Sequence, residues 1–253
     1  MISEISILLP AFTIGLLMMI IHVPLGQEVL RRGIIFIDLS LAQLAAMGAI
    51  FAGMMELNLF AAQACALSCA LLGGLFFKAM EKHFPEIAEA VIGCVFVLSA
   101  TLVILALSGN PHGAEHINDI LSGQLLFATW GSVSFAGTIF IAASVLVYWK
   151  PDIFLHKYFY LVLAAVITTS VQVCGVYLVF ASLIFPAVAT SYMQDGKKRR
   201  IAEYAGEAAG LAAGLLVSFF FDLPAGPAAV WGISMMIPVC LAAKWRKEKK
   251  EMK

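Results

Sequence analysis

Charged residues are scarce in this chain of 253 residues. Lys, Arg, Asp and Glu make up 13% of it, against about 25% in a typical soluble domain. Basic and acidic residues balance at 16 each, so the chain lacks the basic excess that binds nucleic-acid phosphates. Hydrophobic residues reach 62%, which excludes a disordered chain and exceeds what the core of one soluble domain can bury. We therefore expect an integral membrane protein.

The sequence also lacks the common nucleotide-binding loop, G-x-x-x-x-G-K-[ST]. The nearest stretch, Gly196-Lys197-Lys198, has neither the upstream glycine nor the following hydroxyl residue. The chain therefore cannot hydrolyse ATP by that route. If it drives active transport, the energy comes from another subunit or from an ion gradient.

A disulfide framework is missing as well. The five cysteines lie inside apolar runs rather than in paired positions in polar loops. Cys65 and Cys69 are four residues apart and fit either buried packing thiols or soft metal ligands. The N-terminus lacks the cationic region of a signal peptide, so the first apolar run is interpreted as a membrane span.

The apolar runs predict an all-α bundle of eight or nine membrane spans, since about 20 apolar residues cross a bilayer. The run Tyr158–Met193 has no Lys, Arg, Asp or Glu but is interrupted at Gly175, so it counts as one or two segments. A short segment, Leu121–Ala128, is expected before the fifth span. The predicted spans are Ile5–Leu25, Gly33–Met54, Leu57–Phe77, Ile87–Leu107, the part of Leu121–Trp149 after Ala128, Tyr158–Val173, Val176–Met193, Gly206–Phe221 and Pro227–Ala243.

Basic residues set the expected orientation, because they favour the cytoplasmic side. Every second loop carries them, and the loops between carry none. This alternation places the N-terminus outside and the C-terminus inside, which needs an odd number of crossings. Nine segments satisfy it, whereas eight require one re-entrant piece. The basic groups are Arg31-Arg32, Lys78/Lys82, Lys150/Lys157, Lys197–Arg200 and the tail from Lys244.

Few polar side chains lie inside the predicted spans, and each is a functional hypothesis because burying it is costly. Asp38 is roughly 9 Å inside the second span, counted from Arg32. It is either a carboxylate of a transport pathway or an interfacial anchor paired with Arg31 or Arg32. Gln43 lies deeper, near the middle of the bilayer, and about 140° around the helix from Asp38.

Four glutamates are placed near the ends of spans. Glu86 and Glu89 flank the start of the fourth, where the helix dipole favours negative charge. Glu203 and Glu207 flank the start of the span Gly206–Phe221.

The loop after the fourth span holds His112, Glu115 and His116 and no basic residue. If helical, the two histidines would share a face and could hold a divalent cation. The spacing H-x-x-E-H also occurs in inverted zinc proteases. Pro111 and Gly113 disfavour a stable helix across the first histidine. A solvated connector, a metal-contacting loop and a protease site remain open.

Five stretches, in order along nearly the whole chain, resemble the ABC-3 family of bacterial permeases, the membrane subunits of zinc, manganese and iron importers. They are Pro24–Gln43, Glu89–Phe96, Asp119–Leu126, Val173–Thr190 and Asp222–Ala228. In the common family pattern the second span reads D-A-L-S-H, with the aspartate and histidine as pore ligands. Asp38 matches the aspartate, while Ala42 or Gln43 stands where the histidine would be. A neutral amide is a much weaker ligand for zinc than imidazole.

The resemblance implies a type II ABC importer permease, with the whole chain as one transmembrane domain. Such a permease forms a homodimer in the bacterial inner membrane and works with two ATPase subunits and an extracytoplasmic metal-binding protein. It holds no tight cofactor; the cargo is a divalent metal ion, with zinc expected first. Asp38, Gln43, His112, Glu115 and His116 are the candidate pathway or entrance residues. The alternatives are an intramembrane metalloprotease using the H-x-x-E-H loop and a gradient-driven metal carrier. Co-purification with an ATPase subunit distinguishes the first function from the other two.

Overall fold

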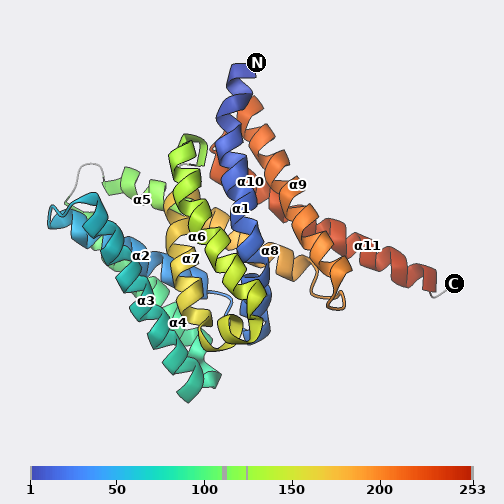
Figure 1. Ribbon diagram of the computed structural model, residues 1–253, viewed down its shortest axis with the longest axis horizontal. Coiled ribbons are helices and arrows are strands. Elements are labelled where there is room, and N and C mark those ends of the chain that lie inside the picture. The colour runs from blue at the N-terminus through green and yellow to red at the C-terminus, as the bar shows by residue number, and fades with distance from the viewer. Residues whose placement is uncertain (1, 110–112, 124, 252–253) are drawn as a thin grey trace.

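The computed structural model describes residues 2–109, 113–123 and 125–251, and these residues form helices joined by short turns (Figure 1). This confirms the predicted all-α fold. The helices are α1 (Ile2–Arg32), α2 (Ile37–Met54), α3 (Leu59–His83), η1 (Pro85–Ile87), α4 (Ala88–Leu107), α5 (Gly113–Ser122), η2 (Leu125–Phe127), α6 (Trp130–Trp149), η3 (Asp152–Lys157), α7 (Phe159–Cys174), α8 (Val176–Ala189), α9 (Lys197–Phe221), α10 (Ala225–Ser234) and α11 (Met236–Glu251).

Eight helical stretches among the described residues are long and apolar enough to cross a membrane. α7 and α8 together form one of them, Phe159–Ala189, and α10 with most of α11 forms another, Ala225–Trp245. The first, on α1, lies inside the bundle, where it packs against α6, α8 and α9 (Figure 1). The count agrees with the predicted range of eight or nine.

The α7–α8 pair turns back at Gly175, so both of its outer ends lie at the same end of the bundle. At the start of α7, the Phe159 ring lies under the guanidinium of Arg32, 4.5 Å from the ring centre. At the end of α8, the Thr190 hydroxyl donates to Glu203, which Gln27 also contacts. Gln27 and Arg32 are within two turns of each other on α1. The pair is therefore the re-entrant piece that eight spans require for an odd number of crossings.

The apex of this pair is a close meeting of glycines. Gly175 has φ +78° and Gly123 has φ +71°, values that favour glycine. A Cβ on either residue would clash with the backbone of the other segment. A Cβ on Gly226, in the first turn of α10, would likewise collide with the carbonyl oxygen of Ser122. The apex of α7–α8 is thus fixed against the end of α5 and the start of α10.

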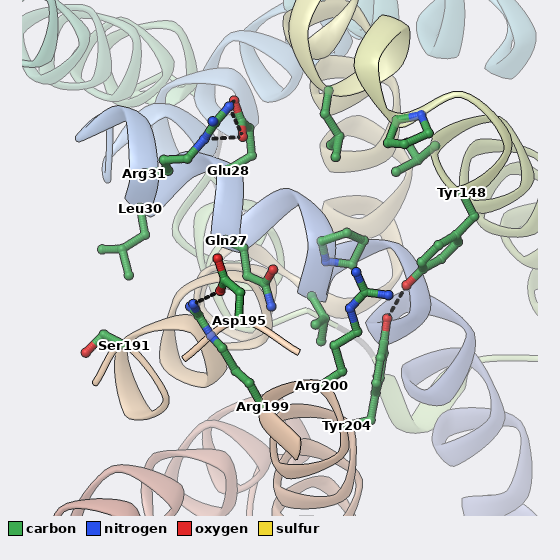
Figure 2. A pocket seen from close by; sticks show the side chains of 15 residues that line it. Gln27, Glu28, Leu30, Arg31, Tyr148, Ser191, Asp195, Arg199, Arg200 and Tyr204 are labelled. Carbon is green, nitrogen blue, oxygen red and sulfur yellow. Dashed lines mark hydrogen bonds and ion pairs between the residues drawn. The ribbon is translucent and has the colours of Figure 1, made fainter. Parts of the chain in front are cut away.

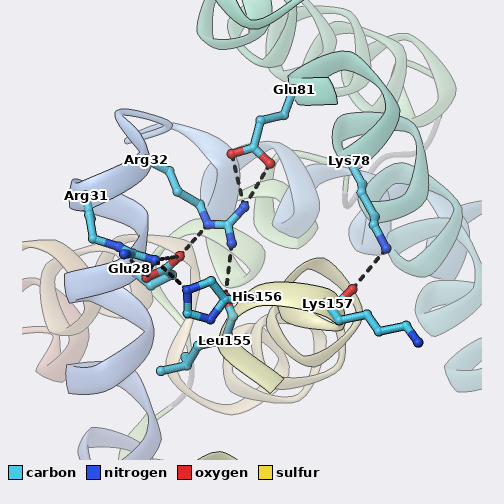
Figure 3. A network of polar contacts seen from close by, with 8 residues as sticks. All are labelled: Glu28, Arg31, Arg32, Lys78, Glu81, Leu155, His156 and Lys157. Carbon is cyan, nitrogen blue, oxygen red and sulfur yellow. Dashed lines mark hydrogen bonds and ion pairs between the residues drawn. The ribbon is translucent and has the colours of Figure 1, made fainter. Parts of the chain in front are cut away.

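The predicted basic loops gather at the opposite end of the bundle. Arg32 donates to Glu81 of α3 at 2.8 and 3.0 Å and to the carbonyl oxygen of Leu155 at 3.0 Å (Figure 3). Lys78 donates to the carbonyl oxygen of Lys157 at 2.9 Å. These contacts join α1, α3 and η3. We call this part of the molecule the basic end and the part around Gly175 the apical end.

Several predicted boundaries differ from those of the structure, and two of the differences bear on candidate functional residues. α9 begins at Lys197 instead of Gly206, because Arg199 pairs with Asp195 and Glu203 one turn away on either side and so extends the helix beyond its apolar part. Glu203 and Glu207 consequently lie within the helix and are buried. The loop after α4 contains the helix α5, which starts at Gly113 itself and so lies beyond Pro111.

Small residues let α9 and α10 approach closely, as membrane helices often do. A Cβ on Gly210 would be 2.6 Å from the Cα of Ile233, and one on Gly214 would clash with the Cα of Ala229. α2 and α3 meet in the same way, since a Cβ on Gly48 would be 2.7 Å from the carbonyl oxygen of Cys65.

Replacing Gly175 by alanine should destabilise the helix bundle. The backbone of Gly175, with φ +78° and ψ 163°, lies in a region essentially confined to glycine and costs an L-residue about 1–3 kcal/mol, and the added methyl group must also push Gly123 away. Gly93→Ala is the matched control, because nothing lies within 4 Å of a Cβ there and alanine favours the helix. Thermal unfolding of the purified chain in detergent measures both. Equal melting temperatures for the two variants would contradict the close apex.

The basic end should face the cytoplasm, as the distribution of Lys and Arg predicts. A cysteine introduced at Lys150 or Lys198 should stay unlabelled when intact cells are treated with an impermeant thiol reagent. A cysteine at Met55, which is exposed between α2 and α3 at the other end, should be labelled. The reverse pattern, measured against the background of the native cysteines, would overturn the orientation.

Candidate functional site

Asp38 lies in the first turn of α2, with 1% of its surface exposed. The amides of that turn are near its carboxylate, yet neither carboxylate oxygen has a hydrogen-bond partner of normal geometry among the described residues. Glu89 is a charged neighbour of Asp38, and its Oε1 accepts from the amide of Phe36 at 3.1 Å. Asp38 is therefore a buried acid facing another acid, an arrangement that suits a passing cation.

The structure contradicts the anchor interpretation of Asp38. Arg31 donates to both oxygens of Glu28, at 2.8 and 2.7 Å, and also contacts His156 at 3.3 Å. Arg32 binds Glu28 and Glu81 (Figure 3). Both arginines thus have carboxylate partners other than Asp38. A pairing of Asp38 with Arg31 or Arg32 was one expectation, because these residues are close in sequence. The turn at Gly33 ends α1 before α2 begins, so proximity along the chain does not bring the side chains together.

Gln43 is 5% exposed and lies on α2, more than one turn beyond Asp38. Between them, the hydroxyl of Ser40 donates to the carbonyl oxygen of Ile92 at 2.6 Å and fixes α2 against α4. Asp38 and Gln43 are thus buried along the same helix, as predicted.

The histidine loop lies far from Asp38. Glu115 is exposed in the first turn of α5, and His116 follows on the same helix. His112 lies outside the described residues. Gly113, the first residue of α5, packs against Leu107 at the end of α4. Asp38 is instead close to the start of α4, where Glu89 is its neighbour and Ser40 of α2 bonds Ile92. From Ile92 to Leu107, α4 rises about 22 Å. The predicted residues therefore form two separate groups, one toward each end.

The described residues contain no group of three or more His, Cys, Asp or Glu side chains placed to hold a metal ion. Cys65 and Cys69 are near Gly48 on α2, at the close contact between α2 and α3, which fits packing thiols. Asp38 and Gln43 supply at most half of a coordination shell.

A second polar cluster lies deeper in the bundle, and sequence reasoning missed it. His22 on α1 is fully buried, with its ring nitrogens 3.1 Å from the hydroxyl of Ser182 and 3.0 Å from that of Ser170. Ser182 also hydrogen-bonds Glu207 of α9. An ionisable side chain inside an apolar run is the signal that selected Asp38. Applied to the first run, it would have found His22.

A cavity of about 480 Å³ opens at the basic end, between α1, α6, η3 and the start of α9. Figure 2 shows its three polar pairs: Arg31 with Glu28, Arg199 with Asp195, and Tyr148 with Tyr204. Ser191 adds the turn after α8 to the lining. The cavity is thus built from the segments that the sequence predicts to be cytoplasmic.

Comparisons with known proteins agree with this architecture. The model of the ABC 3 transport family matches residues 147–244. The structure of PsaBC from Streptococcus pneumoniae in complex with Fab has the same fold, with a TM-score of 0.75, 17% sequence identity and 95% of each chain covered. No curated protein sequence matches the chain.

Residues 147–244 thus match the ABC 3 transport family, and 95% of the chain shares its fold with PsaBC. Together with the eight candidate membrane spans among the described residues, the match fits a multi-pass membrane protein of an ABC transport system. It confirms the family resemblance noted in the sequence.

Proposed function

We propose that this permease imports a divalent transition-metal ion, with zinc as the first candidate, and that Asp38 is the carboxylate the ion passes. The observation that carries the proposal is that Asp38 is buried beside a second acid and has no hydrogen-bond partner among the described residues. In a membrane helix, such a group is costly unless it meets water or a cation. The choice of zinc is supported by the imidazole and carboxylate side chains of the predicted entrance, His112, Glu115 and His116, which are common zinc ligands.

Asp38 and Gln43 make a weak site, and weakness suits transport. A carboxylate and an amide are too few and too poor as ligands to hold zinc tightly. A pore must bind its ion well enough to admit it but loosely enough to release it. Because Asp38 is closed off from the surface, the ion reaches it only when α2 and α4 move apart in an alternating-access cycle.

The incomplete site also supports the predicted homodimer, in which a second copy would complete the coordination shell. Two ATPase subunits would bind at the basic end, where the cavity exposes Arg31 and Arg200 between η3 and the turn that precedes α9. An extracytoplasmic metal-binding protein would deliver the ion at the opposite end, beside α5.

The metalloprotease alternative finds no support in the described residues. α5 is a helix of ten residues with Glu115 exposed, whereas an intramembrane protease needs its ligands on a helix at membrane depth. The family also identifies a transport subunit, which leaves the gradient-driven carrier without a supporting observation.

Asp38→Asn should abolish metal uptake while the chain still assembles with its ATPase. The amide keeps the shape but removes the charge, and uptake should fall about tenfold or more, since a loss of only 1.4 kcal/mol has that effect. Asp222→Asn is the matched control: Asp222 is exposed, and its left-handed conformation suits Asn. Normal uptake in Asp38→Asn cells with normal expression would refute the pathway role.

Replacing His112 and His116 together by alanine should raise the metal concentration for half-maximal uptake several-fold. The difference from wild type should shrink in acidic medium, because a protonated imidazole cannot coordinate a metal ion. Replacement of both by lysine should be worse, because the added charge repels the cation. Asn118→Ala, at an exposed position on α5, is the control. Unchanged uptake in both double variants would make this loop a solvated connector.

A further inference from the structure

The buried cluster around His22 connects four helices through one line of hydrogen bonds. Its members are Glu207 on α9, Ser182 on α8, His22 on α1 and Ser170 on α7, and the hydroxyl of Ser170 reaches the carbonyl oxygen of Val166 at 2.8 Å. All four side chains are buried, with Glu207 2% exposed. The line joins both arms of the α7–α8 pair to α1 and α9.

The number of hydrogens available to these four side chains determines how the line is protonated. Each serine hydroxyl has one hydrogen to give. If Ser170 gives its hydrogen to Val166, the Nε2–H of His22 donates to Ser170, and Nδ1 needs a hydrogen from Ser182. The hydrogen of Ser182 is then spent, so Glu207 makes a hydrogen bond only as a protonated acid that donates to Ser182. Alternatively, Ser182 donates to a carboxylate and His22 is an imidazolium. Both arrangements hold one extra proton.

Without that extra proton, the same hydrogen bonds would leave Glu207 as a poorly stabilised carboxylate. Ser170 would have to turn from Val166 to Nε2, so that Nδ1–H donates to Ser182 and Ser182 donates to Glu207. Glu207 would then be a carboxylate with a single donor, since its Oε2 has no hydrogen-bond partner in the described part of the chain. A buried charge in that state is far more costly than a neutral acid with the same unpaired oxygen.

Glu203, one turn away on α9, shows what a paired acid looks like in this bundle. It accepts from Gln27, from Thr190 at 2.6 Å and from Arg199 at 3.1 Å. Arg199 in turn also binds Asp195. Among the described residues no cation pairs with Glu207 in this way, and the titratable groups beside it, apart from His22, are Glu203 itself and Tyr204, whose hydroxyl bonds Tyr148 of α6. A neighbouring negative charge further disfavours a second carboxylate.

We propose that Glu207, Ser182, His22 and Ser170 form a proton-binding site that holds one proton on Glu207. The acid donates to Ser182, Ser182 to Nδ1 of His22, Nε2–H to Ser170 and Ser170 to Val166. A shift of two hydrogens along the line moves the proton from Glu207 to His22 without breaking it. The site closes the α7–α8 pair against α1 and α9 and leaves no net charge at their junction. It does not depend on which metal is carried.

The experiment compares two isosteric variants on the same helix, Glu207→Gln and Glu203→Gln, in the purified full-length permease with its ATPase. At neutral pH, infrared spectra of the wild type should contain a neutral-carboxyl band that disappears in Glu207→Gln and persists in Glu203→Gln. If the neutral-carboxyl band keeps its full intensity in Glu207→Gln, the proposal is overturned, because Glu207 would then be a carboxylate in the wild type.

Thermal unfolding gives an independent readout. Glutamine imitates the protonated acid, so Glu207→Gln should keep the wild-type melting temperature at neutral pH, whereas Glu203→Gln should lower it by several degrees. The folded wild type binds a proton that the unfolded chain lacks at neutral pH. As the pH rises, the melting temperature of the wild type should therefore fall more than that of Glu207→Gln. A Glu207→Gln chain that fails to assemble, or that follows the pH dependence of the wild type, would contradict the proton-binding site.

Discussion

The cost of a polar group without a partner governs this fold, because the membrane interior offers no water to replace a missing contact. Arg32 shows the constraint at the basic end. With 15% of its side chain exposed, it binds two carboxylates and a backbone carbonyl and lies over the ring of Phe159. These contacts fix α1, α3 and η3 relative to one another. His22 meets the same constraint ten residues earlier, with partners on both arms of the α7–α8 pair.

Asp38 is an exception to this rule, and we propose that it lies on the transport pathway. It is buried, neither of its carboxylate oxygens has a hydrogen-bond partner among the described residues, and the family resemblance assigns its helix to the pore. The turned-back α7–α8 pair lies between the two ends of the bundle, with its apex packed through Gly175 and its arms reaching the basic end. A rearrangement at the basic end would thus be transmitted toward the apical end through helices rather than through loops.

Sequence reasoning predicted the helices because long apolar runs have few alternatives in a membrane. The interruption at Gly175 correctly divided the run Tyr158–Met193 into two helices, but it did not show that they form the re-entrant piece. It failed where pairing decides the structure. The extension of α9 to Lys197 depends on the ion pairs of Arg199, and the partners of Arg32 come from segments about 50 and 120 residues away, separations that no local pattern encodes.

The candidate site was predicted only in part for the same reason. Asp38 stood out as a charge in an apolar run, but its distance from the histidine loop follows from how α2 and α4 pack, which composition does not show. His22 was overlooked although it satisfies the same criterion, because a lone histidine draws attention only once Ser170, Ser182 and Glu207 are brought around it from three other helices.

The central claim is that this chain is the permease through which ATP hydrolysis drives a divalent metal ion. The most direct test is ATP-dependent metal accumulation in vesicles that contain the permease, its ATPase subunit and the extracytoplasmic binding protein, with zinc, manganese and ferrous iron offered in turn. The account predicts accumulation of at least one ion together with stimulated ATP hydrolysis. Accumulation that follows an ion gradient and ignores ATP, or hydrolysis that no metal stimulates, would contradict it.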